Sequence, residues 1–154
     1  MPLQAGDRIL LRDGPDKGKL LSADMLTPGA QGVEAFPFDP VAEVERSRYR
    51  LNRIVVVRLD EGEMSEDTRA MSADGVLVYS AICTHQGCTI ANWVPETRHF
   101  KCFCHLSEFA ALESGEVRGG PARRQLPMVP VTIDADGYVV ATDGFTAKPG
   151  GAKT

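Results

Sequence analysis

Two short segments of the sequence concentrate the residue types that bind metals. The first, residues 83–88, reads Cys-Thr-His-Gln-Gly-Cys, and the second, residues 102–107, reads Cys-Phe-Cys-His-Leu-Ser. Together they hold all four cysteines of the chain and two of its three histidines. Thiolates and imidazoles are the ligands of zinc sites and of iron–sulfur centres. This concentration predicts a metal site built from two loops.

Each loop supplies one Cys followed by one His. These are Cys83 and His85 in the first loop, and Cys102 and His105 in the second. A zinc site usually uses a Cys-x-x-Cys knuckle, which is absent here. One thiolate and one imidazole per loop suit a two-iron cluster with sulfur ligands on one iron and nitrogen ligands on the other. From the residues alone, a zinc site and a scaffold of two disulfides remain alternatives.

The string Cys-Thr-His-x-Gly-Cys, followed by Cys-x-Cys-His-x-Ser with sixteen residues between His85 and Cys102, resembles the Rieske iron–sulfur proteins. The resemblance is to the subset with a disulfide between the loops, as in cytochrome bc complexes and the arsenite oxidase small subunit. It is specific over residues 83–109 and looser over 76–142. It implies one [2Fe–2S] cluster per chain with four ligands, Cys83 and Cys102 on one iron, His85 and His105 on the other.

The resemblance also implies a disulfide between Cys88 and Cys104. Replacing two thiolates by neutral imidazoles converts a dianionic oxidised cluster into a neutral one, so the potential rises into a range of roughly −150 to +300 mV. Two residues are expected to tune it. Ser107 stands where high-potential members aim a hydroxyl at a bridging sulfide, and Phe109 where quinol-oxidising members often carry Tyr. We expect a potential below that of Tyr-bearing relatives and above that of oxygenase ferredoxins.

Some positions depart from the family pattern. Phe103 replaces the usual proline between the second-loop cysteines, Leu106 replaces the glycine after the second His, and Gln86 replaces a common Leu. Residues 120–122, Gly-Pro-Ala, match the start of the proline loop that covers the cluster. The arginines at 123–124 then follow, where relatives often keep another proline. They form either a solvated pair or a contact for a negatively charged redox partner such as an acidic cytochrome.

The elements that must position these loops are predicted to be β-strands. Residues 54–59 are apolar and mostly β-branched, and residues 76–82 form a second such run that leads straight into Cys83. The prolines in 36–40 argue against a central strand, and Pro40 could begin a short helix. Further predicted strands cover residues 7–12, 19–26, 128–133 and 138–142.

Short strands at regular spacing predict an all-β fold. With the resemblance, we expect Rieske-type stacked antiparallel sheets or a barrel with a small inserted cluster-binding subdomain. The chain is predicted to be a single domain. The subdomain would cover about 80–125, the base β domain about 5–79 and 126–143, and a flexible tail 144–154.

The composition of the chain excludes some classes of binding partner. The net charge of −4 gives no basic excess for neutralising phosphates, so nucleic acid is not expected. No apolar run approaches the roughly 20 residues that cross a bilayer, and no signal peptide opens the sequence. Membrane association is therefore expected only through an N-terminal anchor missing from this sequence or through a partner. The implied disulfide favours an oxidising compartment, the periplasmic or extracytoplasmic side of a membrane.

These observations predict an electron-transfer protein, the soluble domain of an iron–sulfur subunit in a quinol–cytochrome c reductase-like respiratory complex. Its partners would be cytochromes of c or b type, with quinol as a candidate donor. One alternative is the small subunit of a molybdenum oxidoreductase such as arsenite oxidase, with a molybdopterin subunit as partner; Ser107 with Phe109 fits it. Another is a stand-alone Rieske ferredoxin. A complete Rieske oxygenase needs two further histidines, and only His99 remains. No arrangement of catalytic residues is found, so no substrate-transforming site is expected.

Overall fold

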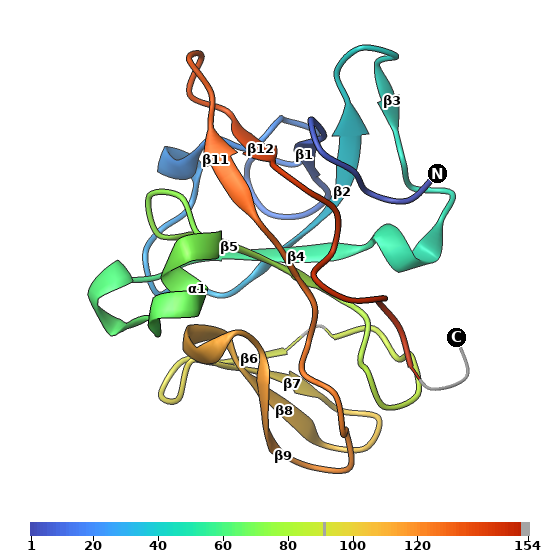
Figure 1. The fold of residues 1–154 in the computed structure, drawn as a ribbon, viewed down its shortest axis with the longest axis vertical. Coiled ribbons are helices and arrows are strands. Elements are labelled where there is room, and N and C mark those ends of the chain that lie inside the picture. Colours follow the sequence, from blue (N-terminus) through green and yellow to red (C-terminus); the bar gives the residue numbers. More distant parts are fainter. Residues whose placement is uncertain (91, 152–154) are drawn as a thin grey trace.

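The computed structural model describes residues 1–90 and 92–151, and nearly all of its regular structure is antiparallel β-sheet (Figure 1). The larger sheet, called the base sheet, has the strand order β10 (Met128–Val129), β5 (Val76–Ser80), β4 (Ile54–Arg58), β2 (Val33–Asp39), β1 (Arg8–Leu11), β12 (Val139–Ala141), β11 (Val131–Ile133), with β3 (Val44–Glu45) paired to β2. The smaller, called the cluster sheet, has the order β6 (Asn92–Val94), β7 (His99–Cys102), β8 (Ser107–Ala110), β9 (Glu116–Gly119). The predicted all-β fold of stacked antiparallel sheets is confirmed.

The base sheet curls into a nearly closed barrel. Its two terminal strands, β10 and β11, are consecutive in the chain and are separated only by Pro130. Proline lacks the N–H that a continuous ladder would need, so the strand breaks there and its two halves pair at opposite ends of the sheet. The single predicted strand over 128–133 is therefore two short strands.

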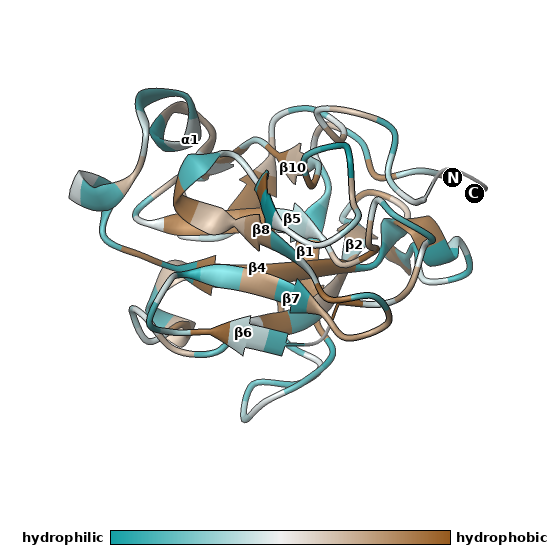
Figure 2. Ribbon diagram, turned by 90° about the horizontal axis from the view of Figure 1, so that it is seen from below, coloured by the Kyte–Doolittle hydropathy of each residue, from teal (hydrophilic) through white to brown (hydrophobic). Residues whose placement is uncertain are grey.

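Strands β4 and β5 are buried on both faces along nearly their whole length, which explains why almost all of their residues are apolar (brown along β4 in Figure 2). Alternate side chains point to opposite sides of a strand. Ile54 and Val56 join the core enclosed by the base sheet, whereas Val55 and Val57 join a second core together with Phe100 of the cluster sheet. This second core fixes the cluster sheet against the base sheet.

Three local predictions are wrong. Residues 19–26 form no strand: Leu20 and Ser22 make isolated bridges, and a 3₁₀ helix spans Ala23–Met25. The proline-containing segment is strand β2, in the middle of the sheet. This is possible because β4 pairs with Val33–Ala35 and β3 with Phe38–Asp39, which leaves Pro37 between them, where neither ladder requires its missing N–H. Pro40 begins no helix, because a turn leads directly into β3.

The remaining helical elements are short. They are one α-helix, α1 (Glu66–Met71), and 3₁₀ turns at Arg50–Asn52, Glu61–Glu63 and Ala111–Glu113. Within residues 1–90 and 92–151, no helix has the length and apolar character needed to cross a bilayer.

Part of the predicted flexible tail contacts the rest of the molecule. Thr146 exchanges two hydrogen bonds with the backbone of Met128, donating its N–H to the carbonyl oxygen at 2.8 Å and accepting the N–H on Oγ1 at 3.0 Å. The following residues run past the loop after β5 (red and yellow-green in Figure 1). Gly150 and Gly151 are buried there. Residues 152–154 of the predicted tail lie outside the described residues.

Candidate metal centre

The first loop, residues 83–88, is a tight turn at the end of β5. The Cys83 N–H donates to the Cys88 carbonyl at 2.8 Å, and the Gly87 N–H donates to the Cys83 carbonyl at 3.0 Å. A further bridge pairs Ile82 with Thr89 beneath the turn. Because β5 is buried throughout, it carries Cys83 into the interior and leaves His85 half-buried at the loop.

The second loop is a hairpin between β7 and β8, closed by the pairing of Cys102 with Ser107. Both residues of this pair are buried, whereas Phe103, His105 and Leu106 are exposed. Leu106 has φ of 65°, the left-handed conformation that glycine adopts most easily. Leucine therefore stands here in a conformation that glycine would adopt at lower cost.

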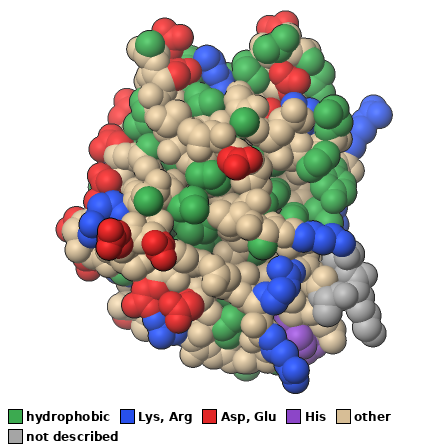
Figure 3. All heavy atoms as spheres, viewed as in Figure 1, with side chains coloured by type: hydrophobic (Ala, Val, Ile, Leu, Met, Phe, Trp, Pro, Cys, Tyr) green, Lys and Arg blue, Asp and Glu red, His purple; other side chains and the backbone are tan. Residues whose placement is uncertain are grey.

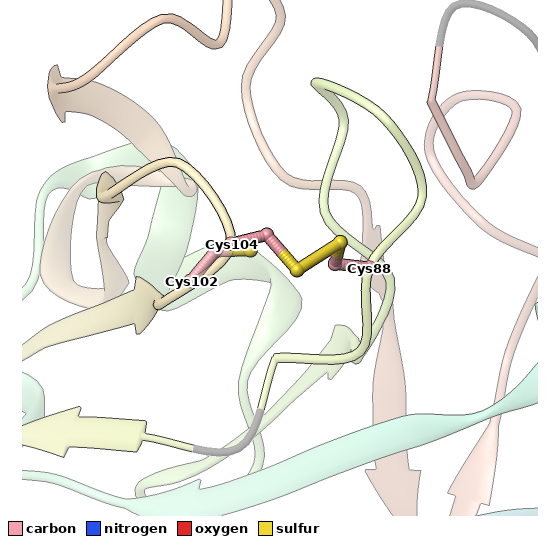
Figure 4. A group of neighbouring side chains, drawn as sticks. All are labelled: Cys88, Cys102 and Cys104. Carbon is pink, nitrogen blue, oxygen red and sulfur yellow. A yellow bond between two sulfur atoms is a disulfide. The ribbon is translucent and has the colours of Figure 1, made fainter.

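A disulfide between Cys88 and Cys104 joins the two loops, as the resemblance implies (Figure 4). Cys102 lies next to it, and the sulfur atoms of these three residues lie within 4.8 Å of one another. Two of the three are consumed by the disulfide and cannot act as thiolates. The free thiols of the chain are Cys83 and Cys102, both buried.

These two thiols lie close enough to influence each other. Burial raises the pKa of the Cys83 thiol, and the neighbouring Cys102 raises it further, while a hydrogen bond from the His85 N–H opposes the rise. That N–H is 3.5 Å from the Cys83 sulfur. Bound iron would reverse this balance, because a metal cation stabilises thiolate directly.

The two loop histidines also meet. The ring centroids of His85 and His105 lie 4.7 Å apart, with their planes almost perpendicular. His85 Nδ1 is buried and has no hydrogen-bond partner among the described residues. A buried nitrogen without a partner is costly unless a ligand satisfies it. Two neighbouring buried thiols and two neighbouring imidazoles are a donor set that fits the four-ligand requirement of a [2Fe–2S] centre.

Ser107 and Phe109 lie on β8, which begins immediately after the second loop. The Ser107 hydroxyl oxygen is fully buried and accepts the Ala122 N–H at 3.1 Å, so its own hydrogen stays available for donation. Phe109 is also fully buried, and it stands opposite Phe100 in the β7–β8 ladder. Its ring has no polar atom with which to contact a cysteine sulfur.

The segment after β9 closes over the second loop. Gly120 has φ of 77°, and a methyl group placed on it would lie 2.4 Å from Ser107 Cα and 2.6 Å from the Leu106 carbonyl oxygen. The Thr84 hydroxyl donates to the Arg124 carbonyl at 2.6 Å, which connects this segment to the first loop as well. All three segments are therefore held against one another.

Comparison with known proteins identifies the family to which the chain belongs. Residues 36–130, more than half of the chain, match the family model described as the Rieske [2Fe-2S] domain. This chain belongs to the Rieske [2Fe–2S] domain family. Its cofactor is a Rieske-type [2Fe–2S] cluster, as predicted. The Cys88–Cys104 disulfide places it with the family members that carry a bond between the two cluster loops.

Several proteins resemble this Rieske domain over most of its length. It is 35% identical to the cytochrome bc1 complex Rieske iron–sulfur subunit of Streptomyces coelicolor, covering 94% of this chain and 47% of that one. The corresponding subunit of Corynebacterium glutamicum is 32% identical, covering 81% and 32%. A putative respiratory nitrate reductase subunit Rieske from Haloferax mediterranei is 34% identical, covering 94% and 62%. The chain thus spans less than two thirds of each of these relatives.

A solved structure supports the fold. The ferredoxin of carbazole 1,9a-dioxygenase from Nocardioides aromaticivorans IC177 superimposes with a TM-score of 0.52 at 16% identity, covering 80% of this chain and 93% of that one. The likeness at so low an identity concerns the fold alone.

Sequence reasoning did not find the residues that hold the loops of this Rieske domain in place. Arg50 donates to the Gly87 carbonyl from a turn 37 residues earlier in the chain. Arg124 donates to the carbonyls of Lys148 at 3.2 Å and Gly150 at 2.8 Å. The pair at 123–124 was expected to be solvated or to face a partner, and Arg124 in fact also ties the C-terminal segment to the cluster face.

Proposed function

We propose that Cys83 and Cys102 bind one iron of the cluster and that His85 and His105 bind the other. The adjacency of the two free thiols, the close contact of the two rings and the unpartnered Nδ1 of His85 support this assignment. When bound, the cluster supplies a one-electron redox centre in the range of roughly −150 to +300 mV. Because His105 is exposed, it offers a route for an electron between this centre and a partner.

Ser107 and Phe109 are proposed to set the potential within that range. The Ser107 hydroxyl, oriented by the Ala122 N–H, can donate its hydrogen toward a cluster sulfur and stabilise the additional negative charge of reduction. Phe109 cannot do so. We therefore expect Ser107→Ala to lower the potential and the wild-type value to lie below that of Tyr-bearing relatives.

We propose that this domain works in the iron–sulfur subunit of a quinol–cytochrome c reductase-like complex. The observation that carries the proposal is the exposed His105 flanked by Phe103 and Leu106, which are 62% and 56% exposed. An apolar rim around an exposed ligand suits docking to a protein or quinol site. Leu106 keeps a left-handed conformation at a cost of about 1 kcal/mol or more, which fits a residue needed for contact rather than for stability. The names of the Streptomyces and Corynebacterium relatives support the same complex.

The Haloferax relative favours an alternative parent. It matches 94% of this chain and is named a putative respiratory nitrate reductase subunit Rieske. A role as the electron-transfer subunit of another oxidoreductase, with its large catalytic subunit as redox partner, would use the same donor set. Phe109 in place of Tyr suits this alternative.

We also propose a domain division and a location for this protein. Residues of about 80–125, which contain the cluster sheet, would form the cluster-binding subdomain on the base sheet. The disulfide between the loops fits an oxidising, extracytoplasmic compartment.

Iron analysis and EPR of the reduced protein test the ligands. We expect two irons per chain and a spectrum typical of mixed nitrogen and sulfur ligation. His105→Ala should abolish that spectrum, whereas the matched variant His99→Ala, outside the donor set, should keep it. Loss of the spectrum in both variants, or in neither, would contradict the assignment. Reduction of the holo-protein by a short-chain quinol then tests the parent complex: no reduction at any pH would favour the alternative.

A further inference from the structure

Two arginines beside the cluster loops, Arg123 and Arg124, have no carboxylate partner among the described residues. Among the described residues, six of the twelve arginines form ion pairs with carboxylates: Arg8, Arg12, Arg46, Arg53, Arg58 and Arg118. Three more, Arg50, Arg69 and Arg98, donate to backbone carbonyls. By contrast, Arg123 is exposed and forms no ion pair or hydrogen bond with any described residue. Arg124 is exposed as well and donates only to backbone carbonyls. Two guanidinium charges beside the donor set thus have no carboxylate partner.

The segments that build this face also lack acidic residues. Residues 82–90, 102–107, 119–130 and 144–151 contain no Asp or Glu, although the whole chain has 21 acidic residues and a net charge of −4. Their formal charges come from Arg123, Arg124 and Lys148. Figure 3 shows basic side chains gathered beside a histidine, with most of the acidic ones on the opposite edge of the same face. The cluster face is positive on a negative molecule.

A hollow lies beside Arg123 and Arg124 on the cluster face. Its volume is about 480 Å³, and it is lined by Thr84, His85, Pro121, Arg123 and Arg124. A carboxylate that entered it would meet two guanidinium groups directly beside a proposed ligand of the cluster. Arginine pairs with carboxylate through two parallel hydrogen bonds, so the hollow suits an acidic side chain on a protein surface.

We propose that this face, with Arg123 and Arg124 at its rim, docks an acidic redox protein and brings the partner's redox centre next to His85 and His105. The proposal rests on the electron-transfer function proposed above and adds the charge of the partner. The attraction between the positive face and the acidic partner raises the association rate, whereas the overall negative charge of the chain disfavours docking through any other face.

Stopped-flow kinetics of the reduced holo-protein test this with two soluble c-type cytochromes, one strongly acidic and one strongly basic, both of higher potential. One electron leaves the protein and reduces the ferric haem, and no atom is transferred. Arg123→Glu reverses a charge on the cluster face without removing a hydrogen bond. Lys17→Glu is the matched control, because it changes the net charge by the same amount in the connection between β1 and β2, on the base sheet. Arg123→Lys keeps the charge. An unchanged EPR spectrum in each variant shows that the site is intact.

With the acidic cytochrome at low salt, we expect Arg123→Glu to slow the bimolecular rate about tenfold. Lys17→Glu should change it less than twofold, and Arg123→Lys should stay near wild type. The difference should shrink as the Debye length falls from about 30 Å at 0.01 M to about 8 Å at 0.15 M salt. Equal slowing by Arg123→Glu and Lys17→Glu would overturn the proposal. So would Arg123→Glu weakening binding to anionic phospholipid vesicles with no effect on the cytochrome rate. If neither cytochrome is reduced, the proposed function itself fails.

Discussion

Replacing Gly120 by alanine should separate the segment after β9 from the second cluster loop. The new methyl group would lie 2.4 Å from Ser107 Cα and 2.6 Å from both the Ser107 nitrogen and the Leu106 carbonyl oxygen. All of these are backbone atoms, so no side-chain rotation can relieve the overlap. The segment must move outward and thereby weaken the hydrogen bond from Ala122 to the Ser107 hydroxyl.

The magnitude follows from a comparison with Gly137. Both glycines have positive φ, 77° and 88°, but nothing lies within 4 Å of a methyl group placed on Gly137. Gly137→Ala therefore bears only the conformational cost, about 1 kcal/mol. Gly120→Ala bears the same cost plus the displacement of packed backbone, a further 1–3 kcal/mol or so by analogy with overpacked cores.

Thermal unfolding of both holo-proteins, followed by far-UV circular dichroism and by cluster absorbance, measures the difference. At roughly 2–4 °C per kcal/mol for a chain of this size, Gly120→Ala should unfold about 2–12 °C below Gly137→Ala. Its reduction potential should also fall, because Ser107 loses its orientation, whereas Gly137→Ala should keep the wild-type potential. Equal melting temperatures and potentials in the two variants would refute the argument from contact.

Three other variants probe the scaffold. Asp7→Ala removes a buried carboxylate that accepts two hydrogen bonds from the Arg46 side chain, at 2.9 and 3.1 Å. It should lower the free energy of unfolding, measured in urea, by about 3 kcal/mol. The control Asp136→Ala, at an exposed position, should stay near wild type. Tyr79→Phe deletes the donor to the Ala111 carbonyl at 2.6 Å and should cost about 1–2 kcal/mol in the same assay; no loss would mean that water replaces the hydroxyl. Removing the disulfide by a Cys88→Ala and Cys104→Ala double variant should destabilise the cluster-free protein by about 3 kcal/mol, and an unchanged urea midpoint would contradict a cross-linking role.

The strands that sequence predicts well are those whose burial is uniform. β4 and β5 are apolar at nearly every position because both of their faces lie in cores, and no other element gives such a run. The cluster sheet was not resolved into strands in advance. Its strands have three or four residues, and β6 is half-buried along its whole length. The alternation of polar and apolar residues in β7 and β9 is therefore too short to identify a strand.

The candidate ligands were predictable for a different reason. Cys83 with His85, and Cys102 with His105, lie within a few residues of each other, so a local pattern contains most of the site's geometry. The residues that fix the loops belong to distant segments. Thr84 bonds to a carbonyl 40 residues later, and such contacts depend on tertiary packing that no local pattern encodes.

The net charge of the chain and the charge of a single face also carry different information. The net charge of −4 argues against nucleic acid as a partner, yet it says nothing about the face that a partner meets. Once the fold identifies the segments that form the cluster face, their lack of Asp and Glu becomes visible in the sequence itself. An acidic chain can therefore present a positive docking surface, because recognition depends on the charges within about a Debye length of the contact, roughly 8 Å at physiological salt, and not on their sum over the molecule.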